Sequence, residues 1–275
     1  MTLYIHVGKG KTATTFLQNK IFNDHKDINY IAKDKNNYPE WLIQWHYADD
    51  FHYNNIKDTI RNKLYDNLQK DKINVISSEA FSIVGDLYKQ VNRIKDIYPE
   101  AKIILTLRDP IDAILSFYKY NIKEEGFTSS LENCIDWKRT PMVFYKRKPI
   151  YIADFYYNEI INLYIKFFGK ENLLILQYED LMNNNKKFFL NLSKYLNVDI
   201  NATNLKNHLQ RKLNKSPLNK DIDKLRIENI QNKIYTDFKT FEGEIIPKDN
   251  TQIMDQELKN KIIEAVKGKC YNYYN

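Results

Sequence analysis

The stretch Leu3-Tyr4-Ile5-His6-Val7-Gly8-Lys9-Gly10-Lys11-Thr12-Ala13-Thr14-Thr15-Phe16-Leu17 decides the fold of this chain. Its first five residues are mostly apolar and predict a short buried strand. Apolar residues at positions 16, 17, 21 and 22 predict a helix after the turn. A strand that turns through glycine into a helix directs several backbone N–H groups, and the positive end of the helix dipole, at one point. We therefore expect the turn to bind a phosphate or a sulfate group.

The turn carries the side chains that such an anion needs. Lys11 brings a positive charge, and the threonines favour caps and first turns of helices, where they donate hydrogen bonds. The predicted anion-binding residues are Gly8, Lys9, Gly10, Lys11, Thr12, Ala13, Thr14 and Thr15. The alternative is an ordinary strand-to-helix turn with solvated lysines. A nucleoside triphosphatase P-loop, G-x-x-x-x-G-K-S/T, does not fit, because Ile5 stands where its first glycine is required.

The turn instead resembles the 5′-phosphosulfate loop of the sulfotransferases, whose usual form is P-K-T-G-T-T-x-L after a strand. Residues Gly10 to Leu17 read GKTATTFL. Gly10 replaces the proline and Ala13 replaces a glycine, so we expect that position 13 does not need a positive φ. Neither replacement removes a phosphate contact.

A further strand is predicted over residues 72–77, and it leads into Ser78 and Glu79. Ligands of doubly wound sheets lie beyond the carboxyl ends of the strands, so Glu79 is expected in the same crevice as Lys11. The S-S-E segment resembles that of glycan-directed sulfotransferases, in which the glutamate is the general base. The alternative is a carboxylate that stabilises the start of a helix.

Residues 102–107 form a nearly continuous apolar run, as expected for a central strand of a parallel sheet. The run leads into Arg108 and Pro110, and proline favours the first position of a helix. A guanidinium at a strand end and a hydroxyl two turns into the next helix can hold one phosphate. The pattern formed by Arg108, Pro110, Ser116 and Tyr118 resembles the 3′-phosphate motif of sulfotransferases. Arg-Asp-Pro alone is an ordinary helix start.

Other segments carry weaker signals. A strand over residues 172–177 leads into Tyr178-Glu179-Asp180-Leu181, which resembles a sulfotransferase segment that is chiefly structural. The basic stretch at 208–217 loosely resembles a late loop that closes over the nucleotide in that family, and its candidate ligands are Arg211 and Lys215. An aromatic helix with Trp41 and Trp45 either lines an acceptor cleft or packs into the core.

Size and composition fit this interpretation. We expect residues 1–275 to form one α/β domain, a P-loop-NTPase-like sulfotransferase fold with a central parallel β-sheet flanked by helices. A loop-rich insertion on the acceptor side is predicted at 123–152, either as a lid or as a solvated surface. The net charge of +7 suits an anionic ligand, without choosing among a nucleotide, an acidic glycan, a membrane surface and nucleic acid.

The two cysteines, Cys134 and Cys270, have neither a disulfide framework nor metal-ligand spacing, and we expect reduced thiols. No signal peptide follows Met1, and no apolar run reaches the ~18 residues of a membrane span. We therefore expect a cytoplasmic protein with no membrane span.

The resemblance, to bacterial carbohydrate-directed members of the family, implies 3′-phosphoadenosine 5′-phosphosulfate as the donor and no metal. Lys11 would stabilise charge on the leaving 5′-phosphate. Glu79 would take the proton from an acceptor hydroxyl, which we expect on a glycan. The alternative base is a histidine, as in small-molecule sulfotransferases, and the candidates are His6, His46 and His52.

Two other functions compete with sulfuryl transfer. A phosphotransferase on a P-loop-like sheet would need a complete P-loop and an aspartate for Mg²⁺. A non-catalytic module that binds a polyanion would show a steep dependence of its affinity on salt. We expect no nucleic-acid partner, and the sequence does not indicate an oligomeric state.

Overall fold

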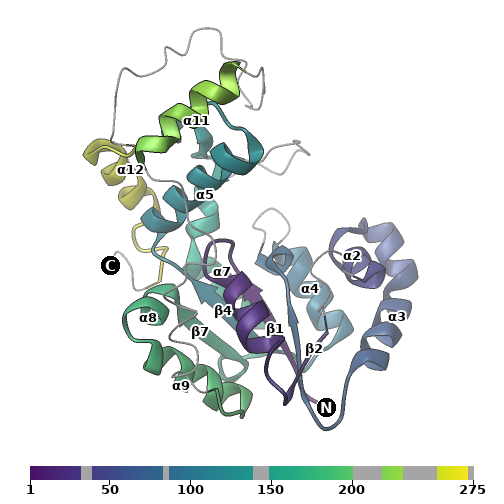
Figure 1. Cartoon of the computed structure of the whole chain (residues 1–275). Helices are drawn as coiled ribbons and strands as arrows, with labels where there is room; N and C mark the ends of the chain where they lie inside the picture. Colours follow the sequence, from purple (N-terminus) through teal and green to yellow (C-terminus); the bar gives the residue numbers. More distant parts are fainter. Residues whose placement is uncertain (32–38, 83–86, 139–148, 201–218, 232–252, 272–275) are drawn as a thin grey trace. The chain divides into compact units, whose positions relative to one another are not determined.

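The computed structural model describes residues 1–31, 39–82, 87–138, 149–200, 219–231 and 253–271 (Figure 1). The chain divides into two compact units. The first comprises residues 1–108 and 159–213, and the second comprises residues 109–158 and 214–275. Each unit is described by itself.

The first unit contains a five-stranded parallel sheet with the strand order β2-β3-β1-β4-β7. The strands are β1 (Leu3–Gly8), β2 (Ile28–Tyr30), β3 (Ile73–Ser77), β4 (Lys102–Leu107) and β7 (Leu173–Gln177). The order confirms the predicted α/β class with a central parallel sheet. The chain builds one half of the sheet after β1 and then crosses to the other side at β4. Such a change of direction opens a crevice at the carboxyl ends of the strands.

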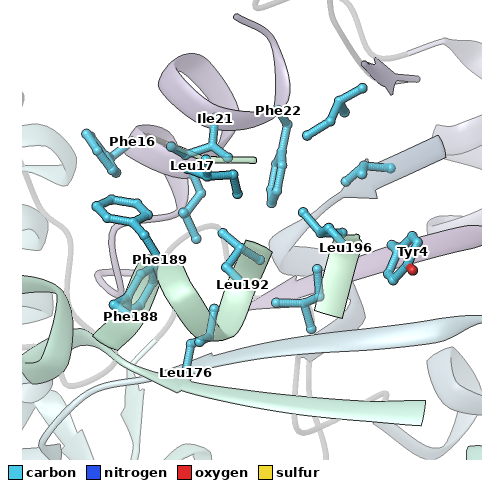
Figure 2. Packing of buried hydrophobic residues seen from close by; sticks show 14 of the residues in the cluster. Tyr4, Phe16, Leu17, Ile21, Phe22, Leu176, Phe188, Phe189, Leu192 and Leu196 are labelled. Atoms are coloured by element: carbon cyan, nitrogen blue, oxygen red, sulfur yellow. The ribbon is translucent and has the colours of Figure 1, made fainter. Parts of the chain in front are cut away.

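The central strands are buried on both faces, which is why they are apolar almost throughout. Figure 2 shows the packing on one face. There, side chains of α1 (Thr14–Phe16) and η1 (Leu17–Phe22) meet side chains of α9 (Asn185–Leu196) above the strands. The labelled members are Tyr4, Phe16, Leu17, Ile21, Phe22, Leu176, Phe188, Phe189, Leu192 and Leu196. This cluster packs α1 and η1 against the sheet, and so fixes the end of the loop between β1 and α1, residues 9–13, here called the anion loop.

The helix after the loop differs from the expected α-helix. Only α1 is α-helical, and η1 is a π-helix. The Asn23 N–H accordingly donates to the Gln18 carbonyl, five residues earlier, at 3.0 Å. The wider turn brings residues five apart onto one face, and the apolar residues 16, 17, 21 and 22 have that spacing.

The other helices of the first unit are α2 (Glu40–Tyr47), η2 (Glu79–Ser82), α3 (Asp50–Asn67), α4 (Leu87–Ile97), η5 (Lys170–Asn172) and α8 (Tyr178–Asn183); α7 (Tyr157–Phe168) begins at the boundary between the units. Trp45 of α2 is fully buried against Phe81, with ring centroids 5.5 Å apart. Arg93 of α4 is also buried, and its guanidinium donates to the carbonyls of Trp45, His46 and Ala48 at the end of α2. It therefore supplies donors to carbonyls that the helix itself leaves unpaired.

The second unit is mainly helical. It contains α5 (Pro110–Glu125), α6 (Leu131–Cys134), η4 (Ile152–Phe155), α11 (Asn219–Gln231) and α12 (Gln256–Val266), with a parallel pair of two-residue strands, β5 (Ile135–Asp136) and β6 (Ile150–Tyr151). Pro110 opens α5 as predicted, and the Asp109 carboxylate caps it by accepting from the Asp112 N–H at 3.1 Å. Asn229 of α11 ties that helix to the end of α5 by donating to the carbonyls of Ile122 and Phe127.

The predicted insertion at 123–152 falls in the second unit, and its residues 139–148 lie outside the described part of the chain. The described part holds the end of α5, α6 and the β5–β6 pair, so it contains more regular structure than the sequence suggested. Its role as a lid stays a prediction. Both cysteines are buried. None of the described helices is long and apolar enough to cross a bilayer.

Candidate functional site

The anion loop between β1 and α1 has an unusual backbone. Lys11 and Ala13 adopt positive φ angles of 68° and 67°, in the left-handed region. The expectation that position 13 does not need a positive φ is therefore wrong. The two glycines of the loop are not among the residues with positive φ. Left-handed residues that alternate with others turn successive N–H groups toward a common point, which is the geometry of anion-binding nests.

Gly8 is needed for space rather than for its backbone angles. A Cβ atom at this position would overlap Cγ2 of Thr14 and would come within 3.0 Å of the His6 ring. Only glycine lets the end of β1 pass this close to the start of α1.

Side chains hold three carbonyl groups of the loop. The oxygens of Gly8, Lys9 and Lys11 accept hydrogen bonds from Ser82 Oγ at 3.3 Å, Thr12 Oγ1 at 2.5 Å and Arg108 Nη1 at 3.2 Å. In a trans peptide the N–H points away from the carbonyl. The N–H groups of residues 9, 10 and 12 therefore face away from these side chains. These contacts fix the orientation of the peptide groups of the loop.

Glu79 lies beside this loop, as the sequence predicted. It is the first residue of η2, separated from the end of β3 by Ser78 alone, and its Oε1 accepts a hydrogen bond from Thr14 Oγ1 at 2.6 Å. Glu79 is exposed whereas Thr14 is buried. The carboxylate is therefore accessible to solvent while a buried hydroxyl group holds one of its oxygens. Thr15 is exposed in the first turn of the helix.

Arg108 lies at the end of β4, next to β1. Its guanidinium stands over the ring of Tyr178, with Cζ 4.4 Å from the ring centroid, and it donates to the Lys11 carbonyl. Tyr178 is the first residue after β7, the neighbour of β4. The sequence analysis treated its segment as chiefly structural and missed this contact. The available signal was an aromatic residue at the carboxyl end of the strand adjacent to that of Arg108.

Comparison with known proteins agrees with this geometry. Residues 5–202 match the sulfotransferase family. The chain belongs to the sulfotransferase family. No curated protein sequence matches it at a significant level.

Solved structures resemble this sulfotransferase in fold. A sulfotransferase from Alicyclobacillus acidocaldarius aligns with a TM-score of 0.53 and 18% identity, over 84% of this chain and 93% of that chain. A mouse sulfotransferase complexed with PAP aligns with a TM-score of 0.47 and 13% identity, over 98% of this chain and 85% of that chain. A sulfotransferase domain from the Curacin biosynthetic pathway aligns with a TM-score of 0.45 and 15% identity, over 75% of this chain and 77% of that chain. At these identities the likeness to the first structure shows the fold alone.

His6 is not placed to act as the base of this sulfotransferase. It is fully buried in β1, with Nδ1 2.7 Å from Ser77 Oγ and Nε2 3.2 Å from Thr106 Oγ1. Burial lowers the pKa of His6 to about 3, so the ring is neutral at pH 7. Both nitrogens are engaged inside the protein, and neither can reach an acceptor hydroxyl.

The other two histidine candidates lie in α2 and α3. His46 is buried, which lowers its pKa to about 4, and its Nδ1 is 3.2 Å from Gln90 Oε1. His52 is exposed and pairs with the Asp49 carboxylate at the start of α3. Glu79 is the candidate that lies beside the loop between β1 and α1, through its hydrogen bond with Thr14.

The remaining predicted ligands lie in the second unit or outside the described residues. Ser116 lies on α5, in the second unit, and its role beside Arg108 stays a prediction. Tyr118 of the same motif is buried and donates to the Ser129 carbonyl at 2.9 Å. Arg211 and Lys215 lie outside the described residues. Within the described residues, no three His, Cys, Asp or Glu side chains form a group that could hold a metal ion.

Proposed function

We propose that this sulfotransferase transfers the sulfuryl group of 3′-phosphoadenosine 5′-phosphosulfate to a hydroxyl group of a carbohydrate. One observation carries the proposal. Side chains at the carboxyl ends of β3 and β4 meet the loop that follows β1: Glu79 through Thr14 at 2.6 Å, and Arg108 through the Lys11 carbonyl at 3.2 Å. A general base, an anion loop and a second cation are thus joined by direct hydrogen bonds.

The donor has two separated phosphates, and the site offers cationic groups for both. The loop N–H groups and Lys11 would hold the 5′-phosphosulfate. Arg108 would hold the 3′-phosphate, because a guanidinium pairs with phosphate in a bidentate manner. Tyr178 would fix the guanidinium plane from one side. Ser116 is the proposed second ligand of the 3′-phosphate.

The chemical step would follow an in-line displacement. The acceptor oxygen forms a bond to sulfur while the bond from sulfur to the 5′-phosphate oxygen breaks. Glu79 accepts the proton of the acceptor hydroxyl, and Lys11 stabilises the charge that develops on the leaving oxygen. The products are the sulfated acceptor and adenosine 3′,5′-bisphosphate.

The carbohydrate acceptor is supported by the S-S-E segment, and the exposure of Glu79 leaves room for a bulky acceptor. Trp45 does not contribute to an acceptor surface, because its side chain is fully buried.

The donor is tested by calorimetry with adenosine 3′,5′-bisphosphate, adenosine monophosphate and ATP. We expect the wild type to prefer the bisphosphate, and Arg108→Ala to lose about 10–100-fold in affinity for it, the usual value of a charge-assisted contact. Arg61→Ala, which removes the same charge from α3, is the matched control and should bind as the wild type does. Equal binding of the three nucleotides would refute the donor assignment, and a preference for ATP would favour the phosphotransferase.

The base is tested by sulfuryl transfer from labelled donor to a panel of polysaccharides, small alcohols and tyrosine peptides. We expect transfer to a polysaccharide, and a loss of at least about 100-fold in Glu79→Gln, with bisphosphate affinity retained. Unchanged turnover in Glu79→Gln would remove Glu79 from the mechanism. Transfer only to alcohols or peptides would refute the carbohydrate acceptor.

A further inference from the structure

We propose that a buried chain of hydrogen bonds through Gln18, Ser77, His6, Thr106 and Thr12 holds the anion loop in the conformation that binds the donor. These five side chains are positioning residues, because they act on the loop rather than on the reacting atoms. The inference rests on the proposed function insofar as the donor is its measured ligand.

The chain occupies a polar row at the carboxyl end of the sheet. In each of the three central strands a buried apolar residue is followed, two positions later, by a buried polar one on the same face. The pairs are Tyr4 and His6 in β1, Val75 and Ser77 in β3, and Ile104 and Thr106 in β4. His6 lies directly beside Ser77 in the strand register. The apolar members belong to the core cluster of Figure 2, so the polar row begins where that core ends.

The contacts at the loop end fix the direction of the protons. Thr12 Oγ1 lies 2.5 Å from the Lys9 carbonyl, which can only accept, so the Thr12 hydroxyl donates there. Thr106 Oγ1, 2.8 Å from Thr12 Oγ1, must therefore donate to Thr12. It follows that Thr106 accepts from Nε2–H of His6 at 3.2 Å.

The contacts at the other end are compatible with this direction. The Gln18 amide donates to Ser77 Oγ at 3.0 Å. The Ser77 hydroxyl can then donate to Nδ1 of His6, 2.7 Å away. The contacts at the loop end therefore set the tautomer, a neutral imidazole with its proton on Nε2, and burial keeps His6 neutral. The chain thus runs in one direction from Gln18 to the Lys9 carbonyl.

The loop needs such support because its backbone is strained. Left-handed backbone at Lys11 and Ala13 persists only when the surroundings impose it. The series of hydrogen bonds ends on the Lys9 carbonyl, two residues before Lys11, and fixes the peptide group between Lys9 and Gly10. The role of Thr12 changes accordingly. Its hydroxyl proton is used within the loop, so Thr12 supports the phosphate site through the backbone rather than by donating to the ligand.

The test compares Thr106→Val with Thr106→Ser. The valine removes the hydroxyl, so His6 Nε2–H loses its acceptor and Thr12 Oγ1 loses the hydrogen bond that it accepts from Thr106, whereas the serine keeps both contacts. We expect Thr106→Val to weaken adenosine 3′,5′-bisphosphate binding about tenfold, the value of one lost buried hydrogen bond, and Thr106→Ser to stay within about twofold. The control is Asn74→Ala, which removes a buried polar hub at the amino end of β3, away from the loop. It should lower stability and leave the affinity unchanged.

A second measurement uses the wild type, so it does not depend on a variant that folds. The ¹⁵N chemical shifts of the His6 ring should show the neutral Nε2–H tautomer and no titration between about pH 5 and pH 8. The Nδ1–H tautomer, or a titration in this range, would overturn the direction of the chain.

The binding results separate the two proposals. A wild type that does not bind the bisphosphate contradicts the proposed function. A wild type that binds, together with unchanged affinity in Thr106→Val or an equal loss in Asn74→Ala, contradicts the positioning role alone. Gln18→Leu removes the first donor of the hydrogen-bonded series. It should weaken bisphosphate binding less than Thr106→Val does, and an unchanged affinity would contradict the proposed series.

Discussion

Replacing Ala13, the N-cap residue of α1, by glycine should stabilise the protein. Ala13 has φ 67° and ψ 26°, and a left-handed conformation costs an L-residue about 1–2 kcal/mol. Glycine avoids this strain, but the greater freedom of its unfolded chain costs about 0.5–1 kcal/mol. The difference leaves a gain of about 0.5–1 kcal/mol in the free energy of unfolding for Ala13→Gly.

The assay is urea unfolding followed by fluorescence and circular dichroism. Ala113→Gly is the matched control, because Ala113 is buried in α5, where the same change should destabilise by about 1–2 kcal/mol through lost helix propensity and a lost methyl group. Opposite signs for the two variants are the expected result. If Ala13→Gly destabilises as much as Ala113→Gly, residue 13 is not left-handed, and the description of the loop as a strained nest fails.

Three further predictions concern stability and donor binding. Arg93→Met should cost about 3–5 kcal/mol in urea unfolding, because carbonyls at the end of α2 lose a buried charged donor, and a cost below about 1 kcal/mol would refute that role. His6 and His46 have pKa values lowered to about 3 and about 4, so the unfolded chain binds more protons as the pH falls below the usual value. The free energy of unfolding should therefore be at its full value above about pH 6.5, and each histidine should lower it by about 2 kcal/mol between about pH 7 and pH 5. His46→Gln should make this decline shallower. An equally steep decline in the variant would contradict the prediction. Tyr178→Leu should weaken bisphosphate binding about fivefold, because it removes the ring that stacks on Arg108, whereas Tyr178→Phe should not. Equal bisphosphate affinities of Tyr178→Leu and the wild type in calorimetry would show that the stacking has no effect on the donor.

The sequence predicted the sheet well because its strands are buried on both faces and read as apolar runs between turn residues. The predicted strand at 72–77 matches β3 to within one residue, the one at 102–107 coincides with β4, and the glycine-rich turn after β1 marked the loop correctly. The predicted meeting of Glu79 with the loop followed from the parallel arrangement, since the carboxyl ends of adjacent parallel strands lie at one edge.

The parts that could not be predicted depend on contacts between distant residues. The positive φ at Ala13 is imposed by the surroundings of the loop against the preference of alanine, so the residue type gave the opposite answer. The π-helical turn of η1 depends on packing against the sheet and α9. The donor to the Lys9 carbonyl is a threonine that looked like a phosphate ligand, because a hydroxyl in sequence does not reveal which acceptor it faces.

The central place of β1 in the sheet also governs when the protein can fold during synthesis. β1 pairs with β3 and β4, which begin only at Ile73 and Lys102. At about 5–20 residues per second, the apolar strand waits about 5–20 s on the ribosome before its second neighbour is made. During this time its unpaired edges are exposed to other chains. The hydrogen bond from Arg108 to the Lys11 carbonyl can form only when Arg108 has emerged, so the loop after β1 takes its final shape late, in the same event that closes the middle of the sheet.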